Sequence, residues 1–362
     1  MYRCLLLLLA LPSLVAADEL AEKIKTITEA PEYKPARWGL LVVDAKTGNT
    51  LYEAAADKLF LPASVTKLYT CATALEQLGA DYRFKTPVYA KGEIKDGILH
   101  GDLVLVASGD LSFGSRRGKD GKTLFANSDH TYANGGAMNA RLTESNPVGA
   151  LQELAGQLKR QALREITGEV LIDDRLFPRA ASTGSGPEIV SPILVNDNIV
   201  DVVVTPGIEG KPAKVTLRPE TPLIRVDTEV YTGKPNSGTA LMLEATGSCE
   251  FVVRGRIAAN AEPEVRIYPV DQPALFARAL FIEALRREGI KVSASIHHVR
   301  SFELPARDGY LKLNKLAEYQ SEPLSDVLKV TLKVSHNLYA STLPILVGLP
   351  HDRPTIIGGL RQ

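Results

Sequence analysis

The sequence predicts an α+β protein in which helical segments near both ends of the chain flank a long β-rich middle. Apolar residues recur with helical spacing at 64–79 and again at 323–349. Between residues 83 and 300, short β-like runs alternate with Gly, Pro, Asn and Asp, which is the pattern of strands and turns. The length of 362 residues, 45% of them hydrophobic, allows two or three domains with large cores.

The first 17 residues have the order of a secretory signal peptide. Arg3 precedes an apolar run from Leu5 to Leu11, and small residues follow up to Ala17. We expect cleavage after Ala17 and export of the mature chain to the periplasm. No later segment has the ~20 uninterrupted apolar residues of a membrane span, so we expect no transmembrane span in the mature chain.

The charge balance and the cysteine count exclude several classes of partner. Lys and Arg number 42 and Asp and Glu number 42, so the net charge is zero. No basic block is present, and we expect no nucleic-acid partner. Cys4 leaves with the signal peptide; Cys71 and Cys249 remain, either as a disulfide or as free thiols. No cluster of Cys or His residues indicates a metal site, and we expect no cofactor.

The first candidate site is the Ser64-Val65-Thr66-Lys67 motif at the start of a predicted helix. The helical pattern begins near Ser64 and ends at Gly79, which places Ser64 and Lys67 one turn apart on one face. In a cleft of low dielectric constant, a lysine amine can lose its proton and then take the proton of the serine. The alternative is that Ser64 only caps the helix and Lys67 is a solvated side chain.

The remaining elements follow from local patterns. Lys46-Thr47-Gly48 is predicted to be the turn of a hairpin with strands at 38–44 and 50–53. A helix is predicted around 18–27, and residues 113–146 are predicted to be irregular or poorly ordered. Further strands are predicted at 103–107, 169–172, 200–205, 214–217 and 251–257, and further helices at 148–163 and 273–288.

A second candidate motif, Ser335-His336-Asn337, lies at the junction of helices predicted at 323–334 and 339–349. Ser335 and Asn337 are two residues apart in a turn, so their side chains can point the same way. A serine and an amide there can relay a proton to a leaving group and hold a substrate backbone. We expect His336, between them, to point away.

The S-V-T-K motif followed far downstream by S-H-N resembles the active-site serine penicillin-recognising enzymes. The long β-rich stretch between the motifs resembles that of the low-molecular-mass class C penicillin-binding proteins, the DacB-like serine DD-peptidases. Four further stretches resemble sequences of that family: 105–110, 172–177, 191–198 and 254–257. The resemblance implies a β-lactamase/transpeptidase-like catalytic domain formed by 18–82 and 301–362, with a β-rich insertion of two domains at 83–300.

The same resemblance implies the roles of four residues. Ser64 is the nucleophile that becomes acylated, with its own backbone N–H as one oxyanion donor, and Lys67 is its base. Ser335 passes a proton toward the leaving D-alanine. Asn337 binds Lys67 and the amide of the substrate. The implied substrates are peptidoglycan stem peptides ending in D-Ala-D-Ala, cleaved by carboxypeptidase or DD-endopeptidase action, and β-lactams are covalent inhibitors.

Two further residues are assigned to substrate binding by the resemblance. In relatives, an acidic residue of the inserted domain meets the ammonium group of the diamino acid of the stem peptide. This suggests Asp173, with Phe177 lining the pocket. The alternative is that Asp173 only ends a strand in a turn.

One departure from the family pattern leaves the function of the chain open. No K-T-G or H-T-G triplet follows Asn337 before the last residue, Gln362. We therefore expect a truncated chain with an incomplete catalytic domain. One alternative function is a non-catalytic module that binds peptidoglycan or β-lactams. Another is a β-lactamase-like hydrolase, which the long insertion disfavours.

Overall fold

The computed structural model describes residues 11–134, 140–300 and 302–361, with side chains from residue 18 onward. The chain divides into two compact units, residues 1–63 and residues 64–362. The first ten residues of the predicted signal peptide lie outside the described residues, and α1 (Leu11–Thr28) includes the predicted cleavage site. Within the described ranges, no helix is both long enough and apolar enough to span a membrane.

The first unit contains α1 and a two-stranded hairpin. Strands β1 (Leu40–Val43) and β2 (Thr50–Ala54) pair antiparallel, with Leu40 opposite Ala54. The turn between them holds Lys46-Thr47-Gly48, as predicted. Asp44 Oδ1 accepts hydrogen bonds from the backbone N–H groups of Lys46 and Thr47, and Gly48 has φ +75°. This triplet is therefore a turn with a local structural explanation.

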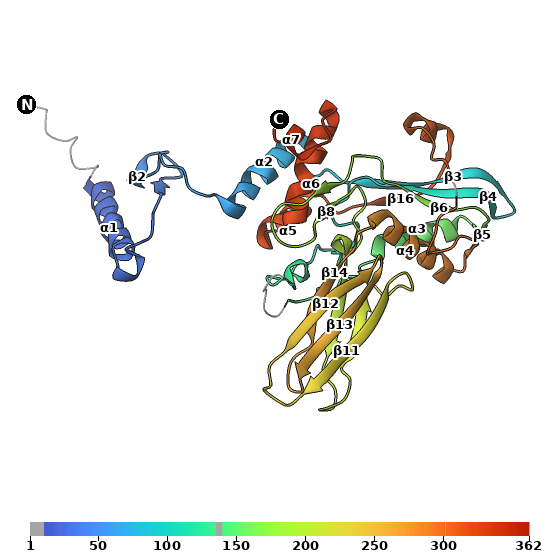
Figure 1. Ribbon diagram of the computed structural model, residues 1–362. Coiled ribbons are helices and arrows are strands. Elements are labelled where there is room, and N and C mark those ends of the chain that lie inside the picture. Colours follow the sequence, from blue (N-terminus) through green and yellow to red (C-terminus); the bar gives the residue numbers. More distant parts are fainter. Residues whose placement is uncertain (1–10, 135–139, 301, 362) are drawn as a thin grey trace, which may run out of the picture. The chain divides into compact units, whose positions relative to one another are not determined.

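The second unit contains a six-stranded sheet (Figure 1). Its order is β15-β5-β4-β3-β16, and β6 also pairs with β4. Helices α3 (Gly149–Arg160) and α4 (Pro273–Arg287) pack on each other, and each contacts a strand of this sheet. The strand bounds are β3 Lys85–Lys95, β4 Ile98–Val106, β5 Glu165–Ile166, β6 Val170–Asp173, β15 Lys291–Val292 and β16 Asn314–Gln320.

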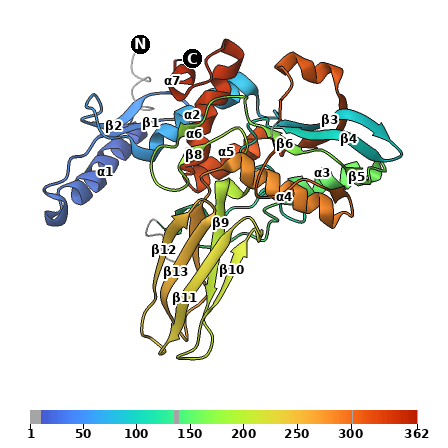
Figure 2. The same ribbon diagram turned by 45° about the vertical axis from the view of Figure 1, so that its right-hand side comes forward.

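Two three-stranded sheets form an elongated lobe that projects from the rest of this unit (Figure 2). One has the order β10-β9-β14 and the other β11-β13-β12. Alternate residues such as Val202, Phe251 and Val253 are fully buried, so the two sheets share an apolar core. The strand bounds are β9 Ile199–Thr205, β10 Lys214–Arg218, β11 Arg225–Gly233, β12 Ala240–Gly247, β13 Glu250–Ala258 and β14 Glu264–Pro269.

A group of helices from both ends of the second unit packs around α6 (Asn337–Gly348), a helix that is buried along most of its length. Both α2 (Thr66–Leu78) and α5 (Leu324–Lys333) pack on α6 and on each other, and α7 (Ile356–Gly359) contacts α6. The short strands β7 (Ala180–Ala181) and β8 (Ile189–Val190) lie beside it. The apolar core of this group includes Cys71, Ala74, Leu324, Val327, Leu338 and Leu343.

The predicted helices and strands are present; most of their ends shift by at most three residues, whereas β4 begins five residues and α1 seven residues earlier than predicted. The α-helix of the first motif begins at Thr66, because Ser64 lies in a 3-10 turn (Ala63–Val65) just before it. Described residues of 113–146 form only a 3-10 turn at His130–Tyr132 and isolated β-bridges, but several of their side chains are buried. Cys71 and Cys249 are both free thiols. The borders of the inserted domains remain a prediction; strand β3, at the start of the predicted insertion, pairs with β16, which follows its end.

Candidate active site

Ser64 and Lys67 meet at the beginning of α2, as their spacing predicts. The Nζ atom of Lys67 donates a hydrogen bond to Ser64 Oγ over 3.0 Å. Lys67 is only 7% exposed, so it is not the solvated side chain of the alternative interpretation. The N-cap of α2 is Val65, which makes no side-chain cap. An amine thus lies within proton-transfer distance of a serine hydroxyl.

The surroundings of Lys67 favour the neutral amine more than water does. Burial lowers the pKa of Lys67 from its ordinary value. Its two hydrogen-bond partners, Ser64 and Asn337, are uncharged. Burial also raises the pKa of the nearby Cys71 to about 11, so this group remains a neutral thiol near pH 7. These neighbours do not compensate the ammonium charge, and a lysine in this position is suited to act as a base.

The second motif reaches the same two residues from the junction of α5 and α6. Ser335 Oγ donates a hydrogen bond to Ser64 Oγ over 2.7 Å, and Asn337 Oδ1 accepts one from Lys67 Nζ over 2.6 Å. Ser335 has φ +59°, a left-handed conformation that is uncommon for serine. The structure therefore brings all four predicted catalytic residues into one hydrogen-bonded cluster; their catalytic roles remain predictions.

His336 points away from this cluster, as predicted. It is fully buried, and its ring stacks on the ring of Tyr339 with centroids 3.7 Å apart. Its Nδ1 accepts a hydrogen bond from the backbone N–H of Tyr339 and so caps the first turn of α6. Burial lowers the pKa of His336, which favours the neutral ring that such a cap requires. His336 therefore has a structural role: it stabilises the start of α6, directly after Ser335.

Tyr132 is a residue of the site that the sequence analysis missed. Its hydroxyl donates a hydrogen bond to the carbonyl oxygen of Ser335 over 2.5 Å and accepts one from the backbone N–H of Asn337 over 3.3 Å. One phenol group thus holds both ends of the Ser335–Asn337 turn. Tyr132 lies in the stretch predicted to be irregular, about 200 residues before the motif, and no local pattern distinguishes it there.

A buried charged network lies behind the motif. Arg116 donates hydrogen bonds to Asp129 over 2.7 and 3.0 Å and to Asp197 over 2.8 Å. The hydroxyl of Tyr339, in α6, donates to Asp197 over 2.7 Å and accepts from Arg116 over 3.2 Å. Burial alone would raise the pKa of Asp197, but Arg116 and the neighbouring histidines together lower that pKa well below the usual range. The carboxylate is therefore ionised and fixes α6 to the loop at 116–132.

The same network holds the loop that carries Tyr132. His130, two residues earlier, lies between Asp201 at 2.6 Å from Nδ1 and Asp197 at 3.1 Å from Nε2. Burial alone would lower the pKa of His130, but the two carboxylates raise it to about 10, so the ring is charged at neutral pH. Asp197 belongs to the stretch 191–198, which the sequence analysis related to the family without assigning it a role. Residues 196–198 all have positive φ, which Asn and Asp tolerate better than most residues.

A loop between β7 and β8 covers the amide of Asn337. The Nδ2 of Asn337 donates a hydrogen bond to the carbonyl oxygen of Ser185 over 2.8 Å. Gly184 has φ +79°, and a methyl group on it would lie 2.6 Å from Asn337 Nδ2, so only glycine allows this close approach. The loop is attached to α6 by Ser341, whose hydroxyl accepts a hydrogen bond from the backbone N–H of Thr183 over 3.0 Å.

The structure does not bring Asp173 and Phe177 into the Ser64 cluster. The carboxylate of Asp173 is bound by the guanidinium of Arg175 over 2.7 and 2.8 Å and by the hydroxyl of Tyr310 over 2.7 Å. Burial alone would raise its pKa, but the hydrogen bonds from Arg175 and Tyr310 and the charge of Arg175 together lower it. Phe177 is 2% exposed within the apolar core around α6. The alternative that Asp173 ends a strand and organises a turn matches its observed contacts, and substrate roles for both residues remain predictions.

The sequence from residue 20 to residue 357 matches the D-Ala-D-Ala carboxypeptidase 3 (S13) family. The chain belongs to this family. The family suggested by the S-V-T-K and S-H-N motifs is thereby confirmed, and the S13 match includes both motifs and the β-rich region between them.

Curated proteins similar to this S13 chain include two carboxypeptidases. The chain is 30% identical over 352 residues to the D-alanyl-D-alanine carboxypeptidase of Actinomadura sp. (strain R39), a match that covers 91% of this chain and 57% of the relative. It is 23% identical over 305 residues to the D-alanyl-D-alanine carboxypeptidase DacB of Haemophilus influenzae (strain ATCC 51907 / DSM 11121 / KW20 / Rd), covering 78% and 53%. The chain thus spans little more than half the length of these relatives.

Solved structures confirm the fold class. The chain is similar to penicillin binding protein 4 (dacB) from Haemophilus influenzae, with a TM-score of 0.63 and 20% identity over 89% of this chain and 65% of that one. The complex of that protein with a novel β-lactam (CMV) gives a TM-score of 0.62 and 22% identity over 89% and 64%. At this level of identity the likeness shows the mixed α and β fold predicted from the sequence.

Proposed function

We propose that this chain is an exported serine-type D-Ala-D-Ala carboxypeptidase, which also acts as a DD-endopeptidase and acts through an acyl-enzyme on Ser64. Its substrates are peptidoglycan stem peptides ending in D-Ala-D-Ala, and β-lactams acylate the same serine. The observation that carries this proposal is the contact of Ser64 Oγ with both Lys67 Nζ, at 3.0 Å, and Ser335 Oγ, at 2.7 Å.

The chemistry follows from these contacts. Neutral Lys67 takes the proton of Ser64 as Ser64 Oγ attacks the carbonyl carbon of the penultimate D-alanine. The backbone N–H of Ser64 stabilises the oxyanion. Lys67 gives the proton of Ser64 back through Ser335, which passes its own proton to the leaving D-alanine nitrogen, and the peptide remains as an ester on Ser64. Water hydrolyses this ester in the second half of the reaction, which frees the serine. Asn337 holds Lys67 and orients the substrate amide.

The test combines acylation with product release. The chain is incubated with a fluorescent penicillin, and the labelled peptide is identified by mass spectrometry. Release of free D-alanine is then measured from a synthetic peptide ending in D-Ala-D-Ala and from a matched peptide ending in L-Ala-L-Ala. Ser64→Ala is the inactive variant. Ser248→Ala is the matched control, because this serine lies in the turn between β12 and β13 in the projecting lobe.

The possible results distinguish the proposed peptidase from a β-lactamase-like hydrolase and from a non-catalytic binding module. A stable adduct on Ser64 together with release of D-alanine from the D,D-peptide alone supports the proposal. Rapid hydrolysis of the penicillin identifies a β-lactamase-like hydrolase. An adduct on another residue, or no adduct at all, overturns the proposed role of Ser64 and leaves a binding module as the remaining function.

A further inference from the structure

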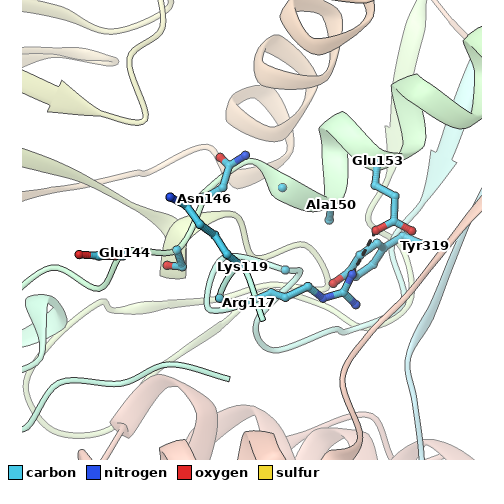
Figure 3. A pocket seen from close by; sticks show the side chains of 11 residues that line it. Arg117, Lys119, Glu144, Asn146, Ala150, Glu153 and Tyr319 are labelled. Carbon is cyan, nitrogen blue, oxygen red and sulfur yellow. Dashed lines mark hydrogen bonds and ion pairs between the residues drawn. The ribbon is translucent and has the colours of Figure 1, made fainter. Parts of the chain in front are cut away.

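A pocket of about 300 Å³ lies where the first turn of α3 meets the loop at 114–119 and strand β16 (Figure 3). Its lining includes Gly114, Arg117, Lys119, Ala150 and Tyr319. We call it the α3 pocket. None of the four residues of the Ser64 cluster lines it, so a ligand bound there is not a substrate in position for attack by Ser64.

Tyr319 brings a buried hydroxyl group without a partner to this pocket. The residue is 1% exposed, and its ring packs edge-on against Phe113 with centroids 5.5 Å apart. Among the residues that the structure describes, none forms a hydrogen bond with the Tyr319 hydroxyl. Burial raises the pKa of Tyr319, so the hydroxyl keeps its proton and can donate. A buried donor of this kind normally has an acceptor.

The start of α3 contributes backbone donors. The first intrahelical bond of α3 runs from the N–H of Gln152 to the carbonyl of Val148, and Val148 makes no side-chain cap. The N–H groups of Ala150 and Leu151 therefore have no acceptor in the described part of the chain. The positive end of the helix dipole lies at the same position.

The surroundings of Gly114 show that the hydroxyl of Tyr319 and the backbone amide of Ala150 border the same space. A methyl group built on Gly114 would lie 2.9 Å from Tyr319 Oη and 3.0 Å from the backbone nitrogen of Ala150. Gly114 has φ +73°, and its missing side chain leaves this space open. In Figure 3, Tyr319 and Ala150 lie close together on the same side of the pocket.

The charges around the pocket select the kind of ligand. Arg117 is already bound by Glu322 and Glu153. Lys119 is exposed and makes no ion pair or hydrogen bond within the described ranges, so its ammonium is available. Glu144 also lines the pocket, and Figure 3 shows both its carboxylate and the ammonium of Lys119 on the side away from Tyr319. One free cation and several neutral donors suit a singly charged acceptor, whereas Glu153 on the wall repels a dianion.

We propose that the α3 pocket binds the carboxylate of a small ligand, such as a free amino acid or the carboxyl end of a short peptide. The amide of Ala150 and the hydroxyl of Tyr319 donate to it, and the exposed side chain of Lys119 turns toward it and adds its ammonium. The volume, at the lower end of the roughly 300–1,000 Å³ found for ligand pockets, fits a ligand of one or two residues. This site is separate from the proposed peptidase site and does not depend on it.

The test follows the backbone amide signals of Ala150 and Leu151 in NMR spectra of the full ¹⁵N-labelled chain. Three probes are titrated: N-acetylglycine, its uncharged analogue N-acetylglycinamide, and inorganic phosphate. We expect saturable shifts of both signals with N-acetylglycine and much weaker binding of the other two probes. Because these signals report on α3, the result is independent of whether Ser64 can be acylated.

Two variants identify the donors. Tyr319→Phe removes one hydrogen bond and keeps the ring packed on Phe113, and we expect it to weaken binding of N-acetylglycine about five- to tenfold. Lys119→Ala should weaken it by a similar factor. The controls are Tyr89→Phe, on β3, and Lys122→Ala, a neighbouring lysine that pairs with Asp120 and does not line the pocket. Both controls should bind as the parent chain does.

Three outcomes would overturn the proposal. The first is the absence of saturable shifts at Ala150 and Leu151. The second is equal binding of N-acetylglycinamide or of phosphate, which would show that a single negative charge is not what the pocket recognises. The third is unchanged binding by a folded Tyr319→Phe chain, whose fold is checked by its unfolding temperature and amide spectrum.

Discussion

The hydroxyl oxygens of Ser64 and Ser335 lie 2.7 Å apart, although 271 residues separate the two serines in the chain. Lys67 Nζ lies 3.0 Å from the same Ser64 oxygen. The nucleophile therefore has two proton carriers in contact, and each can be removed while the Ser64 oxygen stays in place. This separation of roles gives the first two predictions.

Replacement of Ser335 by alanine should slow the reaction without removing the nucleophile or its base. Loss of a general acid or proton relay lowers rates by about 10²–10⁴-fold. We expect a loss in that range in the rate of acylation by a fluorescent penicillin. Ser335 is half-buried, so the unfolding temperature should change little. An acylation rate within about twofold of the parent rate would show that this hydroxyl relays no proton.

The pH dependence of acylation should report the lowered pKa of Lys67. The neutral amine is the active form, so the rate should rise with pH and level off at high pH. The midpoint of this rise should lie below 10.5, the ordinary pKa of lysine. Lys67→Arg keeps the charge but cannot lose its proton in this range. We expect this variant to lose about 10²–10⁴-fold in rate and to lose the rising limb of the profile. A parent midpoint at or above 10.5 would contradict the assignment.

Local patterns predicted the two motifs and the elements that carry them, because helix periodicity and turn residues act over a few positions. The Ser64 cluster was expected from a resemblance, and its geometry comes from packing of α2, α5 and α6 on one another. Tyr132 and the Asp197 network were missed because their partners lie up to about 200 residues away and their surroundings look like a polar loop. Buried charges become recognisable only when the fold shows what pairs with them.

Replacement of Tyr132 by phenylalanine tests whether the turn at Ser335–Asn337 needs the two hydrogen bonds of the Tyr132 hydroxyl. The variant keeps the ring but loses the hydrogen bonds to the Ser335 carbonyl and the Asn337 N–H. We expect a loss of about 0.5–1.5 kcal/mol per hydrogen bond in unfolding free energy. The acylation rate should fall at least about tenfold, with a smaller change in penicillin affinity, because misplacement by ~1 Å is costly in rate.

The matched control for this variant is Tyr231→Phe, on the exposed face of β11 in the projecting lobe, which should leave both the rate and the stability unchanged. If Tyr132→Phe lost stability but kept the parent acylation rate, Tyr132 would be a structural residue only. A loss of rate at unchanged stability would instead indicate that the turn is held in place mainly for catalysis.

The stability of the fold should fall on the alkaline side because of His130. The carboxylates of Asp201 and Asp197 raise its pKa from 6.5 to about 10 despite its burial. A histidine whose pKa is raised on folding contributes stability that is complete below about 6.5 and is lost as the pH rises through about 10. The unfolding free energy should therefore decline across this window, by at most about 1.4 kcal/mol per pH unit.

Asp201→Asn removes a carboxylate that faces His130 and should flatten this decline, while His100→Gln, at an exposed position of β4, should not change it. His336 acts in a different window. Its pKa is lowered by burial, so its contribution is complete above 6.5 and is lost as the pH falls below that value. A parent chain whose unfolding free energy is constant from pH 6.5 to 10 would show that His130 is neutral in the folded state.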